Sequence, residues 1–272
     1  MDTPVTVLEL EARSYEVDAS LEIKPVTYMN WIQEIAWVAA ADQGCSVAWF
    51  VSNNLIPIFG ASHFEKVQPI RYTDRVVART WFMRMEDAFA DRDFEVRRVS
   101  DGELVLFGRV ECILLDYKTR KPTDWGEITK RFRPNGKSVY ENHQKPPLTP
   151  VTEDISFQAK FPVQVAEIDM ARHVNNGFYL RWITDALYNY LHPRLGKAAD
   201  GTNVKSMTMK FGSAISYGQE AVISGKMIGV GDGFSRWSFE LGAEGSKRPA
   251  TAELSVRWSP EWTAQLNGAA SK

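Results

Sequence analysis

Residues 169–182 read Asp-Met-Ala-Arg-His-Val-Asn-Asn-Gly-Phe-Tyr-Leu-Arg-Trp. A carboxylate, an imidazole and two carboxamides therefore fall within eight residues, directly before apolar residues at helical spacing. A helix start offers unbonded backbone N–H groups and a dipole that favours negative charge. A carboxylate beside it can attack a carbonyl carbon, or activate water to do so, while those N–H groups hold the carbonyl oxygen.

This segment resembles the signature D-x-x-x-H-V-N-N-x-x-Y-x-x-W of hotdog-fold thioesterases, in particular the acyl-ACP thioesterases of plants and bacteria. The resemblance implies hydrolysis of an acyl thioester on ACP or CoA to free acid and thiol. It implies that Asp169 is the base or nucleophile and that His173 and Asn175 are further catalytic residues. The helix start at Asn176 and Gly177 is then the oxyanion site that binds the substrate.

Each of these residues also has a structural interpretation. Asp169 can orient the approach to the helix, and His173 can fix the turn. Either Asn175 or Asn176 can be the N-cap, and Gly177 can simply allow close approach to the backbone. We favour function because the residues occur together in the family pattern, whereas Tyr179 and Trp182 read as core residues.

The pattern recurs near the N-terminus. At a shift of 151 positions the matched pairs are Asp169 with Asp18, Tyr179 with Tyr28, Trp182 with Trp31 and Ile183 with Ile32. At a shift of 145 positions Ile215 falls on Ile70. Two copies of one unit are therefore expected. The N-terminal copy has Glu22, Lys24 and Pro25 at the positions of His173, Asn175 and Asn176, so it keeps the scaffold and loses the chemistry.

The expected fold class is α+β, a tandem hotdog in which each copy wraps an antiparallel sheet around one long helix. The predicted domains are residues 1–133, a scaffold with the acyl pocket, and residues 156–272, with the catalytic motif. Residues 134–155 are rich in proline and read as a linker crossing the surface. Gly44 and Pro193 are predicted to end the two helices.

Composition limits the alternatives. The chain has 272 residues, of which 44% are hydrophobic, and a net charge of −2, which argues against a nucleic-acid binder. It shows no secretory signal and no stretch long enough for a membrane span, so a cytoplasmic protein is expected.

Cys45 and Cys112 are predicted to be buried free thiols. No cofactor or metal is expected. The partner is an acyl carrier protein or CoA thioester, and the two copies form an internal pseudo-dimer, with a homodimer left open.

Two departures from the plant enzymes keep other functions open. Those enzymes have Asn two residues after the motif Asp and a catalytic Glu on the following strand, whereas this chain has Ala171 and, in our alignment, Ala214. Asp169 then acts with His173 alone, another group replaces the Glu, or the activity is altered or lost. The alternatives are a non-catalytic acyl-thioester-binding protein and, ranked lower, a hotdog dehydratase or cyclase acting on carrier-bound polyketides.

Overall fold

The computed structural model describes residues 5–141, 146–195 and 203–257. The chain forms two compact units, residues 1–23 with 30–143 and residues 24–29 with 144–272. The junction between residues 143 and 144 falls inside the predicted linker. The grouping of residues 24–29 with the second unit was not predicted from the sequence.

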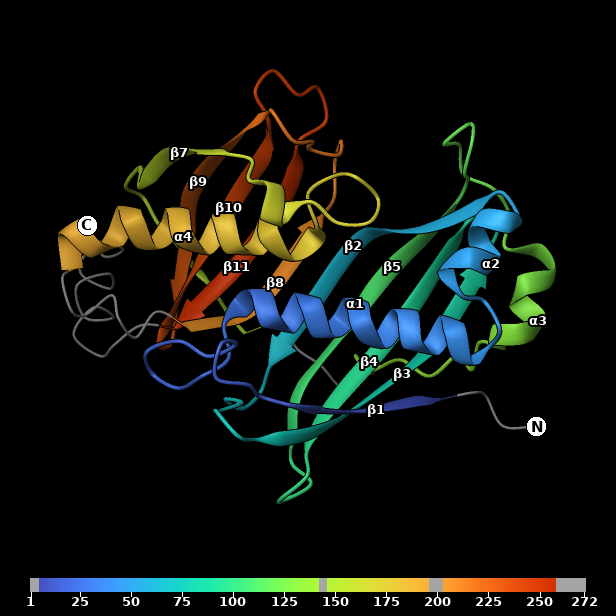
Figure 1. The fold of residues 1–272 in the computed structure, drawn as a ribbon. Helices are drawn as coiled ribbons and strands as arrows, with labels where there is room; N and C mark the ends of the chain where they lie inside the picture. The colour runs from blue at the N-terminus through green and yellow to red at the C-terminus, as the bar shows by residue number, and fades with distance from the viewer. Residues whose placement is uncertain (1–4, 142–145, 196–202, 258–272) are drawn as a thin grey trace. The chain divides into compact units, whose positions relative to one another are not determined.

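The first unit is an antiparallel sheet with one long helix along a face (Figure 1). Its strands follow the order β1-β3-β4-β5-β2. The elements are β1 (Thr6–Glu11), α1 (Pro25–Asp42), α2 (Val47–Ser52), β2 (Leu55–Lys66), β3 (Arg75–Glu86), β4 (Phe89–Arg98), β5 (Leu104–Asp116), the 3-10 turn η1 (Gly126–Ile128) and α3 (Thr129–Phe132). The first five residues of α1 are those grouped with the second unit.

The second unit repeats this plan, with helix α4 along its sheet (Figure 1). Its strands follow the order β8-β11-β10-β9, and both β6 and β7 pair with β9. The elements are β6 (Thr149–Pro150), β7 (Ser156–Pro162), the 3-10 turn η2 (Val165–Glu167), α4 (Asn176–Leu195), β8 (Asn203–Lys210), β9 (Glu220–Gly231), β10 (Phe234–Ala243) and β11 (Ala250–Arg257). The α+β class and the antiparallel sheets agree with the prediction.

Apolar residues at helical spacing form the buried side of each helix. On α1 these include Trp31, Ile32 and Ile35, and on α4 Tyr179, Trp182, Ile183, Ala186 and Leu187. Alternate strand residues such as Phe94 and Val96 are buried as well. Each large side chain buried in this way contributes roughly 1.5–3 kcal/mol to folding. Cys45 and Cys112 are buried free thiols, as predicted, and burial raises the pKa of Cys112 to about 11.

One expectation needs correction. Helix α4 does not end at Pro193 but continues to Leu195. A proline has a helical φ and only lacks one N–H, which costs little in the last turn. The structure adds contacts to the predicted linker, residues 134–155. The backbone N–H groups of Asn135 and Gly136 donate to the carbonyls of Phe82 and Met83 on β3, with N–O distances of 3.1 and 3.0 Å.

The same segment is held further along by charged side chains of the first sheet. The carboxylate of Asp93 on β4 is fully buried and is bound by the Arg109 guanidinium at 2.6 Å (Nε–Oδ1) and 3.0 Å (Nη2–Oδ2). It also accepts the Val139 N–H at 2.8 Å, while Arg109 donates to the Ser138 hydroxyl at 3.0 Å. Residues 135–139 are thus part of the first unit. None of the described helices is long and apolar enough to cross a membrane.

Candidate functional site

The predicted site begins with a tight turn before helix α4. Ile168 and Val174 form an antiparallel bridge, and within it the Asp169 N–H donates to the His173 carbonyl at 3.0 Å. The Arg172 N–H donates back to the Asp169 carbonyl at 3.0 Å. Arg172 has a φ of 64°, the left-handed conformation that lets the chain reverse here. The turn thus brings Asp169 and His173 together across one backbone hydrogen bond.

The two oxygens of Asp169 have different surroundings. Its Oδ1 accepts the Ala171 N–H at 2.8 Å, which ties the carboxylate to the turn. Within the described part of the chain, its Oδ2 has no hydrogen bond, and the side chain is 25% exposed. The His173 Nδ1 lies 3.9 Å from the Asp169 Oδ1. That is beyond hydrogen-bond range but close enough for a protonated imidazole to stabilise the carboxylate. One carboxylate oxygen is therefore fixed and the other is available to a ligand.

The start of α4 decides which backbone donors are available. Asn175 is the N-cap, because its Oδ1 accepts the N–H of Gly177 at 2.8 Å and its carbonyl accepts that of Phe178 at 2.9 Å. The Gly177 N–H, one of the two expected oxyanion donors, is therefore already bonded. Among the described residues, nothing accepts the N–H of Asn176, the first residue of α4. A single backbone donor remains at the helix start.

A buried carboxylate that was not predicted as a site residue anchors this region. Glu167 is 4% exposed, and its Oε1 accepts the Trp182 indole N–H at 3.0 Å while its Oε2 accepts the Gln164 N–H at 2.8 Å. Its carbonyl accepts the Asn175 N–H at 2.9 Å. Glu167 thus joins the turn, the N-cap and the helix. The signal that could have revealed it is its match with Glu16 at the repeat shift.

Tyr179 lies one turn into α4 and is 4% exposed. Burial raises the pKa of its phenol to about 12, and the charge of Asp169 adds to this rise. The phenol is therefore neutral at physiological pH and near enough to Asp169 to be affected by its charge. Its ring centroid lies 6.1 Å from that of Trp182 and 5.7 Å from that of Phe211, as expected for a core residue.

The loop after β8 reaches the turn through one backbone bond. The Val174 N–H donates to the carbonyl of Ile215 at 2.8 Å. Residues 211–219 of this loop include no carboxylate, and Ala214 and Ala171 are both exposed. Neither methyl group can bind water or accept a proton. The site therefore has one carboxylate, one imidazole and one backbone donor, and no described group of His, Cys, Asp and Glu is suited to holding a metal ion.

The N-terminal copy builds the same turn. The Asp18 N–H donates to the Glu22 carbonyl at 2.8 Å, and the Leu21 N–H returns to the Asp18 carbonyl at 3.0 Å. Leu21 has a φ of 62°, matching Arg172. The Asp18 Oδ1 accepts the Ser20 N–H at 2.8 Å, as the Asp169 Oδ1 accepts that of Ala171. The fold of the turn thus needs the capping Asp, which both copies have, but not His173, Asn175 or Asn176.

The anchors of the turn are repeated as well. The Trp31 indole N–H donates to the Glu16 carboxylate at 3.3 Å, and the Ile23 N–H donates to the Ile70 carbonyl at 2.9 Å. The polar residues differ between the two turns. Glu22, at the position of His173, is paired with Lys66. Helix α1 begins with Pro25, at the position of Asn176, and proline has no N–H. The N-terminal turn therefore lacks the imidazole and has no donor at the position of Asn176.

Comparisons with known proteins agree with this pattern. Models of the acyl-ACP thioesterase N-terminal and C-terminal domains match residues 5–131 and 151–257. An oleoyl-acyl carrier protein thioesterase of Arabidopsis thaliana is 23% identical over 192 residues, which is 64% of this chain and 52% of that protein. The chain spans about half the length of the curated relatives it matches.

Solved structures share the fold over nearly the whole chain. A candidate oleoyl thioesterase from Lactobacillus plantarum superposes with a TM-score of 0.80 at 15% identity, covering 95% of this chain and 98% of that one. The 12:0-ACP thioesterase from Umbellularia californica superposes with a TM-score of 0.75 at 19% identity, covering 94% of both chains.

Proposed function

Because this chain belongs to the acyl-ACP thioesterase family, we propose that it hydrolyses an acyl thioester carried by the phosphopantetheine of an acyl carrier protein or of CoA. The products are the free acid and the thiol. The observation that carries the proposal is the environment of Asp169, whose Oδ1 is bonded to the turn and lies 3.9 Å from the His173 Nδ1, while its Oδ2 stays open. We further propose that the two units are hotdog units in tandem, with residues 156–272 as the catalytic one.

In this mechanism the open oxygen of Asp169 takes a proton from water as the water oxygen bonds to the thioester carbon. The C–S bond then breaks, the thiolate leaves and is protonated, and the acid is released. In the other route Asp169 itself bonds to the carbon, and water later hydrolyses the anhydride. The Asn176 N–H is the donor for the carbonyl oxygen as it becomes negative. His173 stabilises the carboxylate and, when protonated, can supply the proton to sulfur.

The alanines at 171 and 214 favour a second candidate, a protein that binds acyl thioesters without turning them over. Each leaves a methyl group where the plant enzymes have a polar side chain, so the water molecule has fewer partners. We place hydrolysis first because a thioester has a good leaving group, and a single carboxylate is chemically sufficient. The dehydratase or cyclase interpretation has no specific observation in its favour.

The test measures free thiol released from a panel of acyl-ACP and acyl-CoA thioesters by the full-length protein. We expect the wild type to hydrolyse at least one member and Asp169→Asn to lose about a hundredfold or more in kcat/KM. Asp18→Asn is the matched control, because Asp18 caps the same turn in the other copy, and it should keep activity within about twofold. An inactive wild type that still binds an acyl chain would overturn hydrolysis in favour of the binding protein.

Single turnover in oxygen-18 water separates the two routes. If Asp169 is the nucleophile, the label enters its carboxylate when the anhydride is hydrolysed at the Asp carbon. If Asp169 is the general base, the label appears only in the released acid. Mass spectrometry of the peptide that contains Asp169 distinguishes these outcomes.

A further inference from the structure

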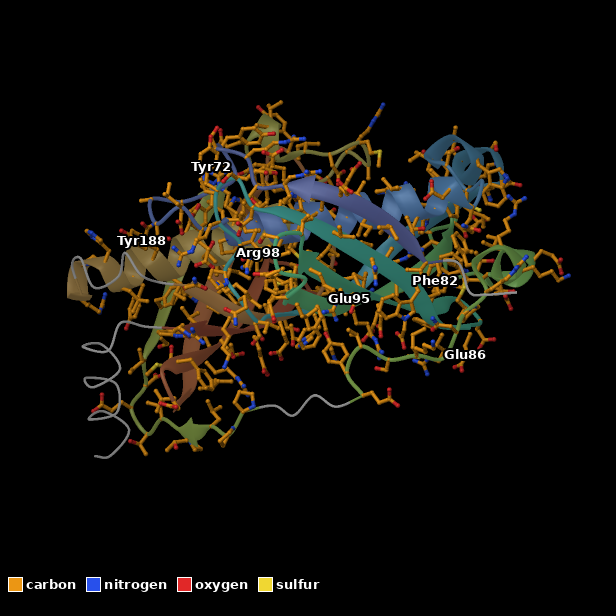
Figure 2. All side chains as sticks on the ribbon, turned by 90° about the horizontal axis from the view of Figure 1, so that it is seen from below. Tyr72, Phe82, Glu86, Glu95, Arg98 and Tyr188 are labelled. Carbon is orange, nitrogen blue, oxygen red and sulfur yellow. The ribbon has the colours of Figure 1, made fainter. Side chains whose placement is uncertain are left out.

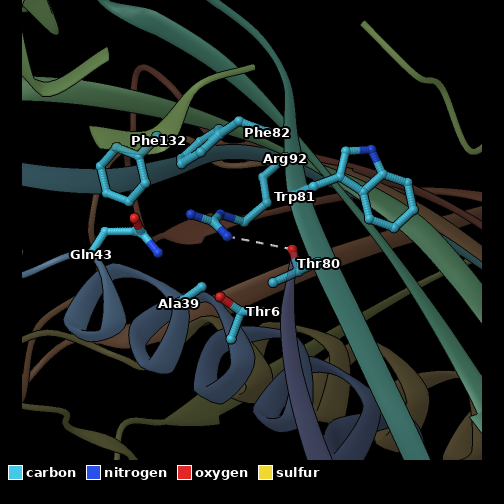
Figure 3. A pocket seen from close by; sticks show the side chains of 8 residues that line it. All are labelled: Thr6, Ala39, Gln43, Thr80, Trp81, Phe82, Arg92 and Phe132. Atoms are coloured by element: carbon cyan, nitrogen blue, oxygen red, sulfur yellow. Dashed lines mark hydrogen bonds between the residues drawn. The ribbon is translucent and has the colours of Figure 1, made fainter. Parts of the chain in front are cut away.

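A buried arginine outside the site already described has no counter-charge among the residues that the structure describes. Arg92 lies on β4 of the first unit and is 5% exposed. It faces a small pocket beside the C-terminal end of α1, where Ala39 of the helix and Gln43, just after it, form part of the wall (Figure 3). Burying a charge without a partner is costly, by several kcal/mol per ion. A partner that supplies negative charge would offset this cost.

The nearest carboxylates along β4 belong to the other face of the sheet. Side chains alternate along a strand, so Asp91 and Asp93 point away from Arg92. Asp91 is bound by Arg84 at 3.0 Å (Nη2–Oδ2), and Asp93 by Arg109. Glu95, shown beside the strands of the first sheet in Figure 2, is paired with Arg79 and Arg97. In the described ranges no carboxylate lies within ion-pair distance of Arg92.

The contacts that Arg92 does make leave most of its donors unused. Its guanidinium carbon lies 3.9 Å from the centroid of the Phe82 ring and 5.9 Å from that of Phe132. Such contacts use the face of the guanidinium, whereas its five N–H groups point outward in its plane. Its hydrogen bond within the described residues runs from Nη1 to the Thr80 hydroxyl and is long, at 3.5 Å. Burial lowers the pKa of Arg92 to about 10, which still leaves it protonated at neutral pH.

The pocket itself offers further donors and little room. The Thr6 hydroxyl and the Gln43 carboxamide line it beside the Arg92 guanidinium. The Thr80 hydroxyl is also in the wall, but it donates its proton to the Asp93 carbonyl at 2.8 Å. The pocket is narrow, with room for a single particle the size of a water molecule or a monatomic ion.

We propose that this pocket is an anion site that holds a single chloride-sized ion on Arg92. A monatomic anion fits the space, accepts from several in-plane donors at once and supplies the missing negative charge. A water molecule would fit as well but would leave the charge uncompensated. The proposal is independent of the hydrolytic function, since none of the lining residues belongs to the Asp169 region.

The first test measures the midpoint of thermal unfolding, Tm, of the full-length protein in potassium chloride, bromide or gluconate at equal ionic strength. Gluconate is too large for the pocket. We expect chloride and bromide to raise Tm by roughly 3–5 °C over gluconate, because an ion that binds only the folded state stabilises it. Arg92→Met should abolish the difference. Arg79→Met is the control, because it removes one positive charge from a half-exposed position on β3 and should keep the difference.

Two further measurements decide the case if Arg92→Met fails to fold. Crystals of the wild type grown in bromide should show an anomalous peak beside the Arg92 guanidinium, and its absence would overturn the proposal. Asp2, outside the described residues, precedes Thr6 in the chain. If wild type shows no halide dependence and Asp2→Asn does, the counter-charge comes from the chain itself and the proposal is wrong. Equal Tm values in all three salts for both proteins would also overturn it.

Discussion

The turns at residues 16–31 and 167–182 have the same backbone and different chemistry. In each, an Asp caps the turn, a residue with positive φ reverses the chain, and a Glu carboxylate accepts a Trp indole N–H. An aspartate at this position is therefore explained by structure alone. The difference lies in what surrounds it: His173 and Asn176 in one turn, Glu22 and Pro25 in the other. These neighbours, and not the aspartate itself, distinguish the C-terminal turn as the candidate catalytic site.

The substitution Asn176→Pro should have the largest effect, because it removes a difference between the two turns. It gives α4 the same first residue as α1. Proline is favourable at the first position of a helix, so we expect little change in stability. The substitution removes the backbone donor, and kcat should fall about 10²- to 10³-fold. The measurement is kcat on the preferred thioester, with Tm as the check on folding. Pro25→Asn is the matched control and should leave kcat unchanged; undiminished turnover by Asn176→Pro would rule out the Asn176 N–H as the oxyanion donor.

His173→Gln is the next largest effect. Glutamine keeps a polar side chain on the turn but cannot be protonated, so we expect about a hundredfold lower kcat. The corresponding change in the other turn, Glu22→Gln, removes the charge that pairs with Lys66 and should lower stability without affecting kcat. Steady-state kinetics and thermal unfolding of both variants provide the check. If the two variants lowered kcat equally, the turns would not differ as we infer.

Two substitutions of Asn175 distinguish its role as the N-cap of α4 from a role in catalysis. Aspartate is as good an N-cap as asparagine, so Asn175→Asp should keep stability, whereas Asn175→Ala should lose about 1 kcal/mol. An added negative charge at the helix start disfavours the developing oxyanion, so kcat of Asn175→Asp should fall about tenfold. Denaturant unfolding and kcat on the same samples test this. A variant that retained both kcat and stability would show that Asn175 only caps the helix.

The last prediction concerns the two tryptophan anchors, which we expect to affect stability and not kcat. Trp182→Phe removes a donor from Glu167, which is 4% exposed, while Trp31→Phe removes one from the more accessible Glu16. We expect losses of about 2 and about 1 kcal/mol in the free energy of unfolding, because an unsatisfied buried acceptor costs more than a solvated one. Urea titrations give both values. The reverse order would mean that ring volume, and not the hydrogen bond, sets the cost.

Much of the fold followed from the sequence. The repeat at 151 positions predicted the two helices, and the matched Ile70 and Ile215 do accept equivalent backbone bonds. The family signature at residues 169–182 predicted the family correctly. The bonded state of the Gly177 N–H was not predictable, because residue types allow either Asn175 or Asn176 to be the cap and only the backbone path decides between them. Whether Arg92 meets a carboxylate depends on which side chains of the neighbouring strands share its face of the sheet. The spacing of residues along β4 does not predict these neighbours on other strands.

The attachment of residues 135–139 to the first sheet has a consequence for where this chain can be divided. Asp93 has no contact with solvent, and it depends on the Val139 N–H as well as on Arg109. A first unit cut after residue 133, as the proline-rich composition suggests, would lose that donor and expose a carboxylate that the full chain keeps dry. A cut placed beyond residue 141 keeps the segment with its sheet. The C-terminal boundary of the first unit is thus set by the hydrogen-bond partners of one buried aspartate and not by the positions of the prolines.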